Sequence, residues 1–169
     1  MREVRDKLLE EVQALERELR VDLPREIKTA LAMGDLRENA EYHAALERQA
    51  FVKARIGQLR QRLTELNNMQ MSNIPTDRAG LGSTVMLLDL DSKEELAYEI
   101  VLPEVADSGQ GKLSIASPIG RGLVDKREGD SVVIQIPSGR RRFEVLGIRT
   151  IHEKDAGGAL PPTQEAKGE

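Results

Sequence analysis

The residues of this chain best able to do chemistry stand close together in the stretch 34-GDLRENAEYHAA-45. Asp35 and Glu38 are three positions apart, and Glu41 follows three positions later. Side chains three apart are neighbours on the surface of a helical turn, so these carboxylates would crowd one small surface. Carboxylate oxygens gathered in this way are the ligands that a hard cation such as Mg²⁺ prefers. One interpretation of the stretch is therefore a weak metal site at an exposed turn.

The same spacing also has a purely structural explanation. An Asp at a helix start with a Glu three residues later resembles a capping box, in which each side chain satisfies a backbone amide of the same turn. Gly34 would then end one helix, because glycine adopts a left-handed conformation at low cost. Asp35 would begin the next helix by accepting its free amide hydrogens. The two explanations are compatible, and both stay open on spacing alone.

Two long helices are predicted to position this stretch. Residues 1–70 repeat apolar residues at steps of three and four, the spacing of a helix with one apolar face. In the first segment these positions are Leu8, Val12, Leu15, Leu19, Leu23, Ile27 and Leu31. In the second they are Tyr42, Ala45, Val52, Ile56, Leu59, Leu63 and Leu66, with Gln49 on the same stripe. Two such helices joined by a short turn should form an antiparallel coiled-coil hairpin, roughly 45 Å long at 1.5 Å per residue. Pro24 should kink or break the first of them.

The second half of the chain changes to the alternating period of β-strands. The expected strands are 84–90, 96–102, 112–115, 131–136 and 141–148. A helix should interrupt them, with Ser117 as N-cap and Pro118 as its first residue, and Ser138-Gly139 should form a tight hairpin turn. The fold class is therefore α+β, a helical hairpin followed by a small antiparallel sheet with a helix. We expect the arm at 1–70, a linker at 71–83, the sheet domain at 84–153 and a disordered tail at 154–169.

Basic residues cluster on the second helix without an intervening acid. They are Arg48, Lys53, Arg55, Arg60 and Arg62. They could pair across the hairpin with acids of the first helix, as solvated helix faces commonly do. The acids within reach are Glu10, Glu11, Glu16 and Glu18. The alternative is a stripe that faces phosphates. A second basic feature, Arg140 to Arg142, places charges on both faces of a strand and predicts an edge strand protected from aggregation.

Composition excludes several classes of function. Aromatic residues make up 2% of the 169 residues, so an aromatic-lined ligand pocket has few residues to draw on. The chain has no cysteine, which excludes disulfides and thiolate chemistry and suits a reducing cytoplasm. A net charge of −4 does not indicate general nucleic-acid binding. The charged N-terminus and the lack of a long apolar run predict no signal peptide and no membrane partner.

Three stretches of the sequence resemble one known family. They are 34-GDLRENAEYHAA-45, 50-AFVKARI-56 and 116-ASPIGRGLVDKREGDSVVIQIPSG-139. Together they resemble the bacterial Gre transcript-cleavage factors, closest to the GreA type, and the similarity covers about residues 5 to 150. The resemblance implies a coiled-coil arm, a linker and an FKBP-like sheet domain. It also implies a monomeric accessory factor of bacterial RNA polymerase in the cytoplasm and not a stand-alone enzyme.

The resemblance further implies how such a factor acts. The arm enters the polymerase's secondary channel, where Asp35 and Glu38 help to hold a second Mg²⁺ and orient the attacking water. The polymerase then cleaves its own backtracked RNA, while the factor keeps no cofactor of its own. The tip would be positioned by Asn39, Glu41 and Tyr42. The rim of the channel would be contacted by Ser117, Pro118 and Ile119. The nascent RNA 3′ end would be faced by Arg37, Arg48 and Lys53.

Three positions depart from the family pattern and keep other functions open. Many members carry basic residues where this chain has Leu31 and Leu46, and Asn or Asp where it has Ala116. The first two changes predict a preference for short backtracks. All three keep open a channel binder that tunes the polymerase without stimulating cleavage. A prolyl isomerase would need an aromatic pocket, and only Tyr98 and Phe143 lie in that half. A plain coiled-coil adaptor would use the tip motif only as a cap.

Overall fold

The computed structural model describes residues 1–34 and 39–155. Their contacts divide the chain into two compact units, Met1–Gln70 and Met71–Glu169. The first unit is helical and the second is built around a β-sheet. Among the helices of the described residues, none is long and apolar enough to cross a membrane.

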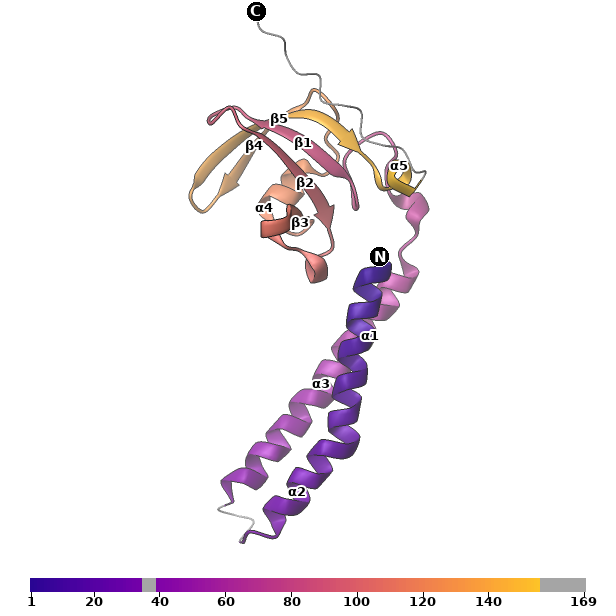
Figure 1. The fold of residues 1–169 in the computed structure, drawn as a ribbon, viewed down its shortest axis with the longest axis vertical. Helices are drawn as coiled ribbons and strands as arrows, with labels where there is room; N and C mark the ends of the chain where they lie inside the picture. The colour runs from indigo at the N-terminus through magenta and orange to yellow at the C-terminus, as the bar shows by residue number, and fades with distance from the viewer. Residues whose placement is uncertain (35–38, 156–169) are drawn as a thin grey trace, which may run out of the picture. The chain divides into compact units, whose positions relative to one another are not determined.

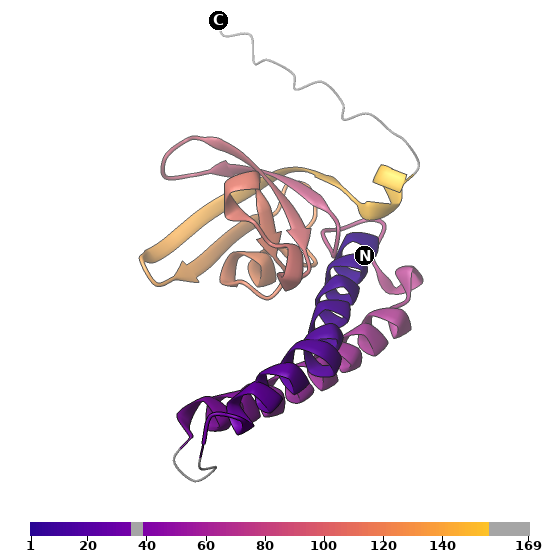
Figure 2. The ribbon, with the colours of Figure 1, turned by 60° about the horizontal axis from the view of Figure 1, so that its bottom comes forward.

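The first unit is an antiparallel helical hairpin, as the apolar periodicity predicts. One side consists of α1 (Arg2–Arg17), the π-helical turn η1 (Glu18–Asp22) and α2 (Leu23–Leu31). The other side is the single long helix α3 (Ala40–Asn68). Figures 1 and 2 both show α3 running alongside α1 and α2.

The break that Pro24 was expected to cause takes the form of the π-helical turn η1. Proline has no amide hydrogen, and its ring collides with the carbonyl four residues earlier in a regular α-helix. The chain widens just before it, and the amide of Leu23 donates to the carbonyl of Glu18, five residues back. Pro24 then stands in the first turn of α2, where a missing amide hydrogen costs nothing.

The seam between the helices follows the predicted apolar stripe along α3. On the first side of the hairpin it departs from the predicted stripe at the end of α2. On α3 the buried residues are Ala45, Val52, Ile56, Leu59 and Leu66. Opposite them Leu23 is completely buried against Val52 and Ile56. Leu31, however, is 44% exposed, and Ala30 is buried in its place. Each step of four residues overshoots a full α-helical turn by about 40°, so two such steps from Leu23 carry Leu31 off the seam.

The second unit is a five-stranded sheet with short helices. Its strands are β1 (Thr84–Asp89), β2 (Glu95–Val101), β3 (Lys112–Ser114), β4 (Ser131–Ile136) and β5 (Gly139–Arg149). They lie in the order β3-β2-β1-β5-β4. Its helical segments are the 3₁₀ turns η2 (Met71–Asn73), η3 (Pro103–Val105) and η4 (Ser108–Gln110) and the helices α4 (Pro118–Leu123) and α5 (Ile151–Asp155). Figure 1 shows α4 on one face of the curled sheet.

Three details of the sheet differ from expectation. β3 pairs with β2 in parallel, because the connection 102–111, with its two 3₁₀ turns, is too long for a hairpin and lets the chain re-enter in the same direction. The tight turn is Pro137-Ser138, since Gly139 already pairs with Ile136. β5 is not an edge strand, because β1 and β4 flank it.

The core of the second unit lies between the sheet and α4. Phe143, Leu87 and Leu123 are completely buried there. The core also includes the end of the segment expected as a linker: Ala79 is fully buried, and its backbone bonds to Asp125 and Lys126. Helix α5 extends two residues beyond the predicted domain limit of 153.

Candidate functional site

The tip of the hairpin is defined by the two helix ends that face it. α2 ends at Leu31, and Gly34 has a positive φ of 142°, a conformation that side chains rarely adopt. α3 begins at Ala40. The predicted metal ligands Asp35 and Glu38 and the predicted RNA-facing Arg37 lie outside the described residues, so their roles stay predictions.

Asn39 is the N-cap of α3. Its side-chain carbonyl accepts a hydrogen bond from the amide of Tyr42 at 3.1 Å, the bond that an N-cap supplies to the first turn. Its side-chain amide donates to the carbonyl of Ala30 in the last turn of α2. The expectation that Asp35 begins the helix is therefore wrong, since α3 starts five residues later. One amide side chain joins both helices where the tip begins.

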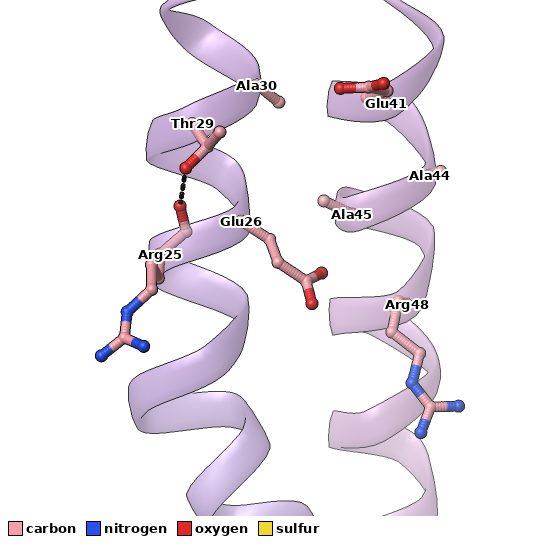
Figure 3. A pocket seen from close by; sticks show the side chains of 8 residues that line it. All are labelled: Arg25, Glu26, Thr29, Ala30, Glu41, Ala44, Ala45 and Arg48. Carbon is pink, nitrogen blue, oxygen red and sulfur yellow. Dashed lines mark hydrogen bonds between the residues drawn. The ribbon is translucent and has the colours of Figure 1, made fainter.

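A groove runs between α2 and α3 just behind the tip (Figure 3). Its volume is about 480 Å³. The lining residues are Arg25, Glu26, Thr29, Ala30, Glu41, Ala44, Ala45 and Arg48. The hollow forms because alanine side chains on both helices are too short to fill the space between them. Figure 3 shows the Glu26 carboxylate reaching from α2 toward α3. Sequence reasoning did not find this groove, although the three alanines near the tip were its signal.

Of the other predicted tip residues, Glu41 is exposed and contributes to the groove. Tyr42 is half-buried, and its ring meets that of His43 edge-on, with the centroids 5.7 Å apart. Among residues 1–34 and 39–155, no three His, Asp or Glu side chains gather closely enough to hold a metal ion.

The basic residues of α3 are largely paired across the hairpin, as the ion-pair alternative predicts. Arg48 donates two hydrogen bonds to Glu18, at 2.6 Å and 3.0 Å. Farther from the tip, Arg55 bonds to Glu11 at 2.8 Å. The last of these cross-hairpin pairs joins Arg60 to Glu16. Lys53, the other described residue predicted to face RNA, is exposed.

Pairing with each other favours the ionised forms of both Arg48 and Glu18. The hydrogen bonds from Arg48 lower the pKa of Glu18, and the bonds to Glu18 raise the pKa of Arg48. A two-pronged bond of this kind fixes the guanidinium plane. The Cζ atom of Arg48 lies 5.2 Å from the centre of the Phe51 ring, one turn along α3. The positive charge of Arg48 is therefore already balanced by the carboxylate of Glu18 before any phosphate approaches.

The segment expected to contact a partner is the start of α4. Ser117 caps this helix by accepting a hydrogen bond from the amide of Gly120 at 3.0 Å, while its hydroxyl donates to the carbonyl of Ser114 at 2.7 Å. Pro118 is exposed, and the half-buried Ile119 packs against the sheet core. The three predicted residues thus present a fixed surface rather than a loose loop.

Two glycines hold α4 unusually close to the sheet. A Cβ atom on Gly120 would collide with the carbonyl oxygen of Ser114. One on Gly122 would lie 2.8 Å from the Ile134 side chain, closer than real Cβ atoms come. The absence of side chains at Gly120 and Gly122 therefore lets the backbone of α4 pack directly against the sheet, which sets the position of the segment that begins at Ser117.

Comparison with known proteins agrees with the two-part architecture. The family model described as the N-terminal domain of transcription elongation factors matches residues 2–67. The model of the C-terminal domain of the elongation factors GreA/GreB matches residues 74–150.

Individual relatives match over most of the chain. The transcription elongation factor GreA of Desulfotalea psychrophila is 44% identical over 144 residues, which are 85% of this chain and 89% of that protein. GreA of Xylella fastidiosa strain 9a5c is 42% identical over 149 residues, covering 86% of this chain and 92% of that protein. Among solved structures, GreA factor homolog 1 of Thermus thermophilus is 27% identical with a TM-score of 0.39, covering 86% of this chain and 94% of that one. This chain therefore belongs to the GreA/GreB family of transcription elongation factors.

Proposed function

We propose that this protein acts as a monomer in the secondary channel of bacterial RNA polymerase and stimulates cleavage of backtracked RNA. Its arm carries Asp35 and Glu38 to the active centre, where the two carboxylates share a Mg²⁺ ion with the polymerase. Two metal ions stabilise the attacking and leaving oxygens of a phosphodiester hydrolysis. The polymerase performs the reaction, and this chain supplies carboxylates that hold the metal and orient water.

The observation that carries the proposal is the identity of the α3 cap. Asn39 caps the helix, so Asp35 is not needed to begin it. The structural explanation for the Asp35–Glu38 spacing thereby loses its main support. Two acids in a segment between two capped and clamped helix ends are better explained as reagents, because they add negative charge that the start of α3 does not require.

The start of α4 supports a second contact, at the outer rim of the channel. We infer that Ser117, Pro118 and Ile119 form it, because the Ser117 cap and the glycines behind it make this segment rigid. A preorganised surface loses little conformational freedom on binding.

The test separates a cap from a reagent. Asp35→Asn and Glu38→Gln together remove both charges and keep side-chain shape. We expect the double variant to keep its melting temperature and its ability to compete for polymerase, while stimulated cleavage of stalled complexes collapses. Raising Mg²⁺ should recover part of the lost rate, because mass action compensates for a weakened metal site.

A matched control is Glu3→Gln with Asp6→Asn, which removes two carboxylates from exposed positions of α1. That variant should cleave like the parent. If the tip variant stimulates cleavage at the parental rate at low Mg²⁺, the metal role is wrong. If the parent itself binds polymerase without changing the cleavage rate, the protein is a channel binder of the non-cleaving kind.

A further inference from the structure

The exposed ring of Phe51 is a feature of the arm that neither the buried seam nor the proposed metal site explains. The chain has only four aromatic residues. Phe143 is completely buried, and both tyrosines are half-buried. Phe51, by contrast, is 57% exposed, although its neighbour Val52 is completely buried in the seam. A chain this poor in aromatics therefore leaves one of its two phenylalanine rings in solvent.

The exposed ring is part of an ordered arrangement. The guanidinium of Arg48 lies 5.2 Å from the ring centre, within the range of a cation–π contact. That guanidinium cannot swing away freely, because Glu18 on the opposite helix holds it through two hydrogen bonds. Phe51 and Arg48 together form what we call the Phe51 platform, two planar groups fixed on the surface of α3.

We infer that the Phe51 platform stacks an unpaired base of extruded RNA, which rests on the proposed function of the arm. Every base has a flat face, whatever the RNA sequence. Aromatic rings and guanidinium planes are the groups on which proteins stack such bases. The balanced charge of Arg48 fits this mode, because stacking needs its plane rather than a free positive charge.

An apolar pocket of a protein partner suits the platform less well. Ala50 and Ala54 flank Phe51 on the helix surface, together with the charged Glu47, so no contiguous apolar patch surrounds the ring. Insertion of the ring into a dry pocket would also bury the guanidinium and the Glu18 carboxylate beside it, which is costly. A base leaves both charges at the edge of the stack in contact with water.

The position of the platform sets which RNA it can reach. Phe51 is eleven residues beyond the start of α3, which is about 16 Å along the helix. Only RNA extruded several nucleotides past the active centre would reach it. The platform should therefore matter for long backtracks and not for short ones.

The test uses stalled polymerase complexes with RNA extruded to a series of lengths, each carrying 5-iodouridine at one extruded position. This base forms photo-cross-links with aromatic rings on which it stacks. With the parent protein, we expect the cross-link to map to Phe51 for long extrusions only. Phe51→Leu should abolish it and slow cleavage of long extrusions on the order of tenfold, whereas Phe51→Trp should keep both. Leu9→Ala, which trims another exposed apolar residue, is the matched control and should change neither.

Each outcome decides between the inference and the proposed function. Cleavage by the parent with no cross-link at Phe51 and no effect of Phe51→Leu at any length overturns the platform and leaves the function intact. A Phe51-dependent cross-link without stimulated cleavage supports the platform and overturns the proposed function. A loss of polymerase affinity in Phe51→Leu that is equal at all RNA lengths, with an unchanged melting temperature, would show that the ring is an anchor for protein and overturn the inference. A parent that does not bind the complexes overturns both.

Discussion

At the scale of single residues, Asp89 shows how the sheet unit ties a turn to a distant strand. It is 7% exposed at the end of β1. One carboxylate oxygen accepts hydrogen bonds from the amides of Asp91 and Ser92, and the other accepts from Arg141 at 3.0 Å. The bond from Arg141 is the main cause that lowers the pKa of Asp89, and the two backbone amides lower it further.

This lowered pKa predicts a stability that depends on pH. A carboxyl group whose pKa is lower in the folded state stabilises that state above its unfolded pKa, about 3.9 for Asp. The contribution is lost as the pH falls through the lowered folded value. Asp89→Asn keeps an oxygen for the two amides but removes the charge that faces Arg141. We expect the variant to have a lower denaturation midpoint than the parent at pH 7, with the gap closing under acidic conditions.

The measurement is a series of denaturant titrations from neutral to strongly acidic pH. Asp91→Asn is the control, because its pair with Arg142 is about half exposed on both sides and exposed pairs contribute little. A gap between parent and Asp89→Asn that stays constant over the whole range would contradict the assignment.

At the scale of elements, the sequence predicts the helices and strands better than their ends. The stripe on α3 and the alternation in β4 are long, regular patterns, and both elements appear where expected. The cap of α3 was misplaced because Asp35 and Asn39 are equally good cap residues, and only the hairpin's geometry decides between them. Asn39 has a partner on α2 at Ala30, and no local pattern reveals a bond between residues nine apart.

The candidate site was predictable only in part for the same reason. The tip motif and the Ser117 cap are local signals that can be identified from the sequence. The groove and the Phe51 platform depend on which face of each helix meets the other, and that is set by tertiary packing. The Arg140 to Arg142 run likewise predicted an edge, yet β4 covers one side of it. On the other side the β1 ladder reaches Phe143, and the amide of Leu90 still donates to the carbonyl of Arg142, so Arg140 and Arg141 lie past the end of this pairing.

Leu31 at the end of α2 and Leu46 on α3 lead to a prediction about RNA binding. Leu31 is exposed and Leu46 is half-buried, so long polar side chains can replace both without disturbing the seam. Leu31→Arg with Leu46→Arg should extend stimulated cleavage to longer extruded RNA, through phosphate contacts that weaken as salt rises. The same positions changed to Gln supply polarity without charge and should leave product lengths unchanged. Equal product lengths for the Arg and parent proteins at low salt would show that these positions do not face RNA.

At the scale of the whole molecule, the two units have separate cores. Leu23, Val52 and Ile56 form a cluster in the hairpin. The cluster around Phe143, Leu87 and Leu123 belongs to the sheet unit. Local stability should follow this division, because a cooperative unit opens as far as its shared contacts extend.

Leu23→Ala tests this division in the full-length chain. Removing a completely buried leucine side chain costs about 2–5 kcal/mol. Amide hydrogen exchange should therefore quicken across α1, α2 and α3 while the protection of β1 to β5 stays unchanged. The reciprocal variant, Leu87→Ala, should loosen the sheet and spare the hairpin. Exchange that quickens in both units with either variant would show that they unfold together.

The glycines behind α4 bear on how this protein can diverge. A side chain at Gly120 would displace the backbone of Ser114, and one at Gly122 would require the Ile134 side chain to move, so substitution at both positions is restricted by geometry. The neighbouring Ala116, Pro118 and Arg121 are exposed and carry no such constraint. If this segment makes the proposed rim contact, relatives adapted to polymerases with different rims should vary at these outward positions on an unchanged backbone. A library built to retarget the protein would randomise the same three codons and keep both glycines.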